Sequence, residues 1–175
     1  MKHIGILAHS FEGATLCFRT ACLEGVERLG AHMHPEITMT CSPMALALDA
    51  WERGDNAELR PFFVADAAKL AAAGADFFVL PDNTAHIALE SEGEPFPLPG
   101  LHIGEVVAEE AQKRGFRKVG ILGTKYTMTG PVYPGALGRP PNEYGIWSVT
   151  ISLTYMIGNA LAGRFSARLG VERMA

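Results

Sequence analysis

Hydrophobic and polar residues alternate along the chain in blocks that are typical of strands and helices. Four short apolar runs predict strands, over residues 4–8, 37–41, 75–80 and 119–122. Three longer stretches predict helices, over residues 13–29, 57–73 and 104–114. A further short apolar element begins at residue 101. Strands that alternate with helices at this spacing indicate an α/β fold with a parallel sheet flanked by helices.

The two longer predicted helices carry apolar stripes, which are typical of helices that pack one face against a core. In the first helix the stripe consists of Leu16, Thr20, Leu23 and Val26. In the second helix it consists of Leu59, Phe63, Ala67 and Leu70. Gly30 and Gly74 follow the two helices and predict where they end.

Polar side chains gather where the third predicted strand ends. Pro81 stops the apolar run, and Asp82, Asn83, Thr84 and His86 follow it. Ligands of open α/β sheets bind just outside the carboxyl ends of the strands. Asp82 or His86 could therefore act as a general acid or base. Structural roles stay open for both, as a loop anchor for Asp82 and as a hydrogen-bonding core residue for His86.

A second polar cluster, residues 123–129, follows the fourth predicted strand and contains Thr124 and Thr127. If two lobes face each other, both clusters line one cleft, which suits a small polar ligand. Ser10 follows the first strand and could cap the next helix. The backbone N–H groups at that turn either bind an anion such as a carboxylate or form an ordinary turn.

Composition narrows the classes of function. A chain of 175 residues, nearly half of them hydrophobic, has room for one domain and an extra piece. The net charge of −4 gives no reason to expect nucleic acid as a partner. Neither a glycine-rich phosphate motif nor a metal-ligand spacing is present in the sequence. Three cysteines without a CxxC pair, and no secretory signal, predict a cytoplasmic protein with reduced thiols.

Four segments follow one another in the order and spacing of a known family: IGILAHSFEGAT, GADFFVLPDNTAH, LPGLHIGEVVAEEA and KVGILGTKYTM. Together they resemble the aspartate/glutamate racemase family over residues 1 to about 138. The resemblance implies two similar α/β lobes with the active site between them. It implies inversion of an amino acid at Cα without a cofactor, by one acid/base residue from each lobe. It also implies that the substrate carboxylate is held by Asn83, Thr84, Thr124 and Thr127. Assembly of the chain into a homodimer is left open as one alternative.

Two departures from the family pattern stand out. Many relatives have a cysteine just before the Asn-Thr pair, where this chain has Asp82. A carboxylate there predicts a shifted substrate, because it would repel the second carboxylate of aspartate or glutamate. No cysteine follows Cys41, so the second acid/base residue is missing and the second lobe is expected to be truncated. The alternative is a non-catalytic lobe that only binds a carboxylate. His86 and His102 are expected to lie around the site, and His9 to be a turn or supporting residue.

The chain accordingly divides into a first lobe, 1–100, the start of a second lobe, 101–138, and a helical tail, 139–175. Residues 144–163 carry no charge and have the length of a membrane helix. With the arginines that follow, this stretch resembles a segment of a major-facilitator drug-efflux transporter. Membrane association through the tail is therefore one expectation. The other is a buried C-terminal helix packed on the racemase lobe.

Overall fold

The computed structural model describes residues 1–117 and 119–137. The chain divides into two compact units, residues 1–119 and 120–175. The expected tail, 139–175, including the uncharged stretch, lies outside the described residues.

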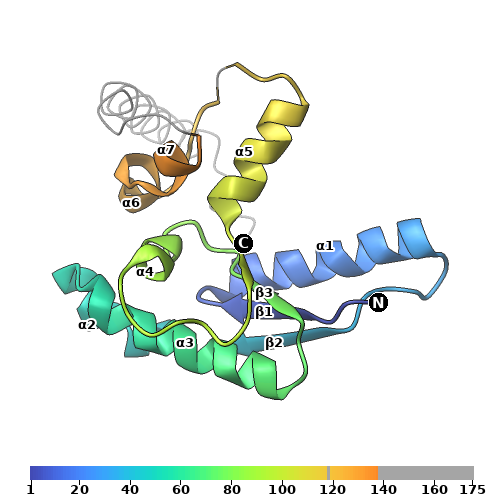
Figure 1. The fold of residues 1–175 in the computed structure, drawn as a ribbon, viewed down its shortest axis with the longest axis horizontal. Helices are drawn as coiled ribbons and strands as arrows, with labels where there is room; N and C mark the ends of the chain where they lie inside the picture. Colours follow the sequence, from blue (N-terminus) through green and yellow to red (C-terminus); the bar gives the residue numbers. More distant parts are fainter. Residues whose placement is uncertain (118, 138–175) are drawn as a thin grey trace, which may run out of the picture. The chain divides into compact units, whose positions relative to one another are not determined.

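A four-stranded parallel sheet forms the centre of the first unit, with the strand order β2-β1-β3-β4 (Figure 1). Its strands are β1 (Ile4–Ala8), β2 (Ile37–Cys41), β3 (Phe77–Val79) and β4 (Gly100–Leu101). The helices of this unit are α1 (Phe11–Leu29), η1 (Met44–Leu46), α2 (Leu48–Arg53), α3 (Asn56–Ala72), α4 (His86–Glu90) and α5 (Ile103–Lys113). The predicted α/β fold with a parallel sheet flanked by helices is confirmed.

The central strands β1 and β3 are short, and backbone contacts define where they pair. Ile4 pairs with Phe77 and Ile6 with Val79. Before this pairing, the Asp76 carboxylate accepts the His3 backbone N–H at 2.7 Å. After it, Pro81 has no N–H to donate to a neighbouring strand. The third strand is therefore shorter than the predicted 75–80.

Helix α3 packs with the apolar face that the sequence predicts. Its four stripe residues are all buried: Leu59, Phe63, Ala67 and Leu70. They join Leu7, Phe78 and Leu80 of the sheet region in the larger core cluster. Helix α1 covers the other face of the sheet and forms a smaller cluster around Ile6, Ala8 and Ala14 (Figure 1).

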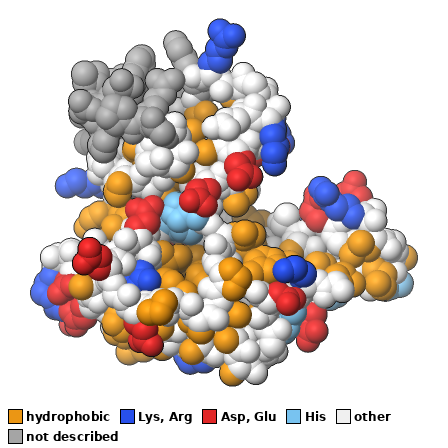
Figure 2. Space-filling model, in the orientation of Figure 1, with side chains coloured by type: hydrophobic (Ala, Val, Ile, Leu, Met, Phe, Trp, Pro, Cys, Tyr) orange, Lys and Arg blue, Asp and Glu red, His pale blue; other side chains and the backbone are white. Residues whose placement is uncertain are grey.

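The predicted packing face of α1 is wrong. Leu16 and Leu23 are 65% and 51% exposed, whereas Ala14 and Gly25 are buried. The helix packs through small residues because they let its backbone approach its neighbours closely. A Cβ added at Gly25 would lie 2.8 Å from the Cα of His34. Hydrophobic side chains consequently show on the surface over α1, at the right of Figure 2.

The second unit contains two short helices among its described residues, α6 (Lys125–Thr129) and α7 (Val132–Ala136). The strand predicted over residues 119–122 is wrong, because these residues pair with no other strand in the part of the chain that the structure describes. Leu122 at the end of this run is 70% exposed. An apolar run forms a strand only where another strand accepts its backbone hydrogen bonds.

No helix in the described ranges, 1–117 and 119–137, is long and apolar enough to span a membrane.

Two leucine substitutions test the assignment of the core. We expect Leu70→Ala to lower the free energy of unfolding by about 2–5 kcal/mol, because it leaves a cavity between α3 and the sheet. Leu16→Ala should change it by less than about 0.5 kcal/mol, because that side chain is largely exposed. Urea unfolding followed by circular dichroism measures both. Comparable losses in the two variants would contradict the packing of α1.

Candidate functional site

The polar residues that follow the two central strands lie at one edge of the sheet. Strands β1 and β3 are parallel neighbours, so the residues that follow them lie at the same carboxyl edge. His9 and Ser10 follow β1, and the segment that contains Asp82 follows β3. The predicted site residues of the first lobe are therefore brought together by this pairing.

The first turn of α1 lies directly against the loop after β3. A Cβ added at Gly13 would overlap with the carbonyl oxygen of Pro81. Only glycine permits this approach, which sets the distance between α1 and the residues that follow Pro81. Ser10 occupies the N-cap position of α1, but its hydroxyl makes no capping hydrogen bond, so the predicted capping role is wrong.

Asp82 organises the turn that carries the predicted substrate-binding residues. Its Oδ1 accepts the backbone N–H groups of Thr84 at 3.0 Å and Ala85 at 3.2 Å. Asn83 and Thr84 lie in this turn, immediately before α4. The predicted loop anchor is thus present, and a catalytic role for Asp82 stays a prediction.

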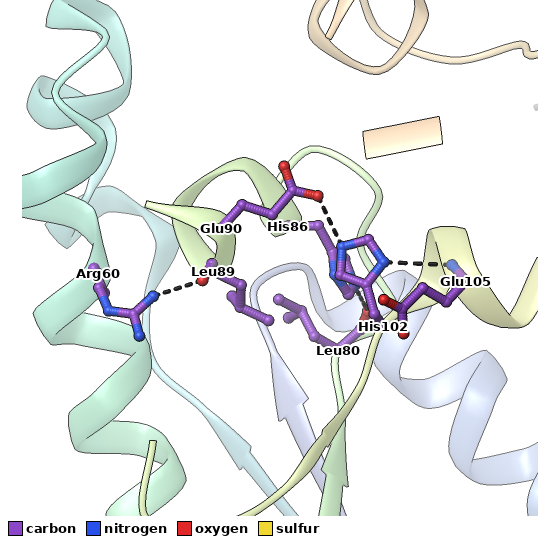
Figure 3. Close-up of polar contacts among 7 residues, drawn as sticks. All are labelled: Arg60, Leu80, His86, Leu89, Glu90, His102 and Glu105. Atoms are coloured by element: carbon purple, nitrogen blue, oxygen red, sulfur yellow. Dashed lines mark hydrogen bonds and ion pairs between the residues drawn. The ribbon is translucent and has the colours of Figure 1, made fainter. Parts of the chain in front are cut away.

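His86 is a fully buried residue beneath this turn (Figure 3). Its Nε2 lies 3.0 Å from the carbonyl oxygen of Leu80, which requires Nε2 to carry the proton and donate it. Nδ1 has no hydrogen-bond partner among the described residues. Burial lowers the pKa of His86 to about 4, because the charged imidazolium would lose its hydration. His86 is consequently a neutral structural residue at neutral pH.

His102 connects the loop region to α5. Its Nε2 donates to Glu90 Oε1 at 2.9 Å, and its Nδ1 accepts the Glu105 backbone N–H at 3.4 Å (Figure 3). The imidazole thereby caps α5 at its N-terminus. Its ring also lies edge-to-face with that of His86, with 4.5 Å between the centroids. These contacts give both histidines structural roles, and their expected place around a substrate site stays a prediction.

Arg60 of α3 holds the segment that follows α4. Its guanidinium donates to the carbonyl oxygen of Leu89 (Figure 3). It also donates to the carbonyl oxygens of Ser91 and Glu94, and it lies over the Phe96 ring. Several charge-assisted hydrogen bonds from one side chain restrict the backbone on the far side of the short helix α4. The loop of Asp82 is therefore bounded by fixed elements at both of its ends.

His9, expected from the sequence to be a turn or supporting residue, lies at the same edge of the sheet as Asp82. Its half-buried ring lies 5.4 Å from the ring centroids of both Trp51 and Phe63. Burial lowers its pKa, and the negative charge of Asp82 opposes this effect. The sequence did contain one signal for a role of His9 at this edge, namely its position directly after a predicted strand.

In the second unit, Thr124 is the N-cap of α6 and Thr127 is buried in that helix. The Thr127 backbone N–H donates to Thr124 Oγ1 at 3.3 Å, and the two hydroxyls lie 3.2 Å apart. The two threonines thus share one turn. Whether they line a common cleft with Asn83 and Thr84 stays a prediction.

Within residues 1–117 and 119–137, no group of three or more His, Cys, Asp or Glu side chains is arranged to hold a metal ion.

A parallel sheet with a carboxylate, an imidazole and a polar turn at its carboxyl edge has the α/β architecture in which ligands commonly bind at that edge. The family follows from sequence comparison. Residues 7–150 match the Asp/Glu/hydantoin racemase family, and the chain belongs to it.

Individual relatives agree with this assignment. The broad specificity amino-acid racemase RacX of Bacillus subtilis (strain 168) is 34% identical over 83 residues, which cover 47% of this chain and 36% of RacX. A candidate Asp/Glu racemase from Yersinia pestis has the same fold, with a TM-score of 0.72 and 28% identity. The aspartate racemase homologue PH1733 from Pyrococcus horikoshii OT3 gives a TM-score of 0.65 and 30% identity.

The comparisons also bear on the extent of the likeness. The alignments with the Yersinia pestis and Pyrococcus horikoshii structures include 78% and 79% of this chain. They include 60% and 61% of the solved chains. The chain therefore spans about three fifths of each solved relative. The family match continues to residue 150, beyond the expected boundary near 138. The comparisons give no support to the transporter resemblance of the tail.

Gly13 offers a test of the packing between α1 and the loop after β3. Alanine normally stabilises a helix by about 1 kcal/mol relative to glycine. At Gly13 we expect the opposite, a loss of about 1–3 kcal/mol in unfolding free energy, because the new Cβ meets the Pro81 carbonyl oxygen.

Gly135→Ala in α7 is the matched control, because its added Cβ meets no described atom within 4 Å. Chemical unfolding compares the two variants. A stabilised Gly13→Ala protein would show that α1 and this loop are not in close contact.

His86 predicts a pH dependence of stability. Its folded-state pKa of about 4 lies below the ordinary value of 6.5, so the unfolded chain binds the proton more tightly. The stabilisation is fully present above about pH 6.5 and is lost as the pH falls to about 4. We expect a loss of up to about 1.4 kcal/mol per pH unit in that window.

His86→Gln keeps an N–H donor for the Leu80 carbonyl but does not titrate. The variant should be less sensitive to acid than the parent protein in urea unfolding between pH 7 and 4. Other titrating groups, including His9, affect both proteins alike, so the difference reports on His86. Parallel pH profiles would refute the neutral, buried imidazole.

Proposed function

We propose that the chain removes and returns the Cα proton of a small amino or carboxylic acid, without a cofactor, as an isomerase of the racemase type. The observation that carries the proposal is the parallel pairing of β1 with β3. Because both strands end at the same edge of the sheet, His9, the Asp82 carboxylate and the Asn83-Thr84 turn lie at that edge. Membership of the Asp/Glu/hydantoin racemase family supports the reaction type.

The polar turn supports a carboxylate-bearing substrate. The Asn83 amide and the Thr84 hydroxyl are donors of the kind that bind a carboxylate, and Asp82 fixes the turn that carries them. Thr124 and Thr127 would contribute from the second unit, and Ser10 from the exit of β1. The negative charge of Asp82 disfavours a substrate with a second carboxylate. We therefore expect amino acids with an uncharged side chain to be preferred over aspartate and glutamate. The similarity to RacX, described as a broad specificity amino-acid racemase, supports such a range.

A lobe that binds a carboxylate without turnover is the second candidate. The cysteines of the chain are Cys17, Cys22 and Cys41, all before β3, so the thiol pair of the family resemblance is missing. Burial raises the pKa of Cys17, which packs against the smaller core cluster. This thiol is therefore unsuited to replace a catalytic thiolate.

Deuterium exchange separates the two candidates. The protein is incubated in D₂O with a panel of L- and D-amino acids, and proton NMR follows the loss of the Cα–H signal. We expect exchange with one or more uncharged amino acids, and slower exchange with aspartate and glutamate. Chiral chromatography of the same samples reports whether configuration is inverted.

Asp82→Asn provides the comparison for substrate charge, because asparagine retains an oxygen acceptor for the turn. The variant should lose part of the discrimination against acidic substrates. An unvaried preference would remove the Asp82 charge from substrate selection. Absence of exchange across the whole panel, with saturable binding of amino acids, would instead favour the binding lobe.

A further inference from the structure

We propose that His9 is the group that takes up the Cα proton at this edge, and that Asp82 acts on it through its negative charge. This inference deepens the proposed function and rests on it. It assigns the acid/base role to an imidazole in place of a thiol, and makes Asp82 a positioning and charge-supplying residue.

The topology places His9 beside the polar turn. Ile6 of β1 pairs with Val79 of β3. Three residues after this pair, both segments have left the sheet, one at His9 and the other at Asp82. The two groups are close enough for the charge of Asp82 to act on the imidazole. The approach of Gly13 to Pro81 fixes the same two segments from the helix side.

The surroundings of His9 hold its ring while leaving it accessible. Trp51 of α2 lies at a tilted angle to it, and Phe63 of α3 meets it edge-on. Both rings are uncharged, whereas the negative charge of Asp82 acts on the imidazole. His9 itself is half-buried, in contrast to the fully buried His86. A small substrate at the sheet edge can therefore reach His9 but not His86.

The hydrogen bonds of Asp82 make it the weaker candidate for the base. Its Oδ1 already accepts two backbone N–H groups, those of Thr84 and Ala85. An oxygen that accepts two backbone N–H groups is engaged in holding the turn and is less available to a substrate proton. An imidazole, with an ordinary pKa of about 6.5, is better matched to proton transfer near neutral pH.

The proton transfer balances with the groups present. The Cα–H bond of the substrate breaks, its electron pair stays on Cα and is delocalised into the substrate carboxylate, and the proton forms an N–H bond on His9. The imidazolium gains from the negative charge of Asp82. Reversal of the step returns a proton from His9, exchanged with solvent, to Cα. The environment of His9 favours the neutral imidazole that the forward step requires, because burial lowers its pKa.

The experiment measures exchange of the Cα proton in D₂O with the full chain and with three variants. His9→Gln should slow exchange by about a hundredfold or more, the size of a typical general-base contribution. Asp82→Asn should retain exchange, while the acid limb of its pH profile moves to lower pH, because a charge that raises the pKa of His9 is removed. His32→Asn is the matched control, since this exposed histidine has a positive φ of 64° that asparagine tolerates, and its exchange should be unchanged.

A second pair of measurements separates chemistry from folding. His9→Ala should recover exchange when imidazole is added, while circular dichroism and thermal unfolding check that each variant is folded. An Asp82→Asn profile without any shift, or a folded His9→Gln protein with parental exchange, would overturn the role of His9. Loss of exchange in Asp82→Asn together with its retention in His9→Gln would assign the base to Asp82. Absence of exchange in the parent chain would refute the proposed function itself.

Discussion

The parallel pairing of β1 with β3 is the contact on which the candidate site depends. It aligns Ile6 with Val79, and the segments that follow the two strands leave the sheet at the same edge. The residues of the site come from segments more than seventy positions apart, so local sequence alone does not bring them together. Gly13 completes the arrangement, because its missing side chain admits the Pro81 carbonyl oxygen against the first turn of α1. The site is thus formed by backbone geometry before any side chain contributes chemistry.

Three polar side chains at this edge have different environments and therefore different capacities. His86 is completely buried with its Nε2–H bonded to Leu80, and is fixed as a neutral structural group. Asp82 accepts two backbone N–H groups of its own loop, and so supplies charge and fixes the geometry of the turn. His9 is half-buried between two aromatic rings and retains access to a ligand. Burial and hydrogen bonding thus give different capacities for proton transfer to residues that are equally plausible catalysts from the sequence.

Two kinds of sequence signal gave different results. The stripe of α3 was informative because its large apolar residues, such as Phe63 and Leu70, are themselves the packed ones. The stripe of α1 was misleading because close backbone approach selects small residues, and leaves Leu16 and Leu23 exposed. The apolar run 119–122 failed for another reason: the described chain offers it no strand to pair with. Hydrophobic periodicity identifies a helix or a run, but not the neighbour it packs against.

Local sequence patterns were sufficient to predict the fold class, the strand β2, the helix α3 and the polar cluster after β3. These depend on local patterns, namely apolar periodicity, glycine and proline breaks, and motif order. Three properties became visible only in the folded chain: the packed face of α1, the inaccessibility of His86, and the proximity of His9 to Asp82. Those properties depend on burial and on pairing between distant segments, which no single stretch of the chain encodes. The physical reason is that desolvation and close packing arise only when the segments meet.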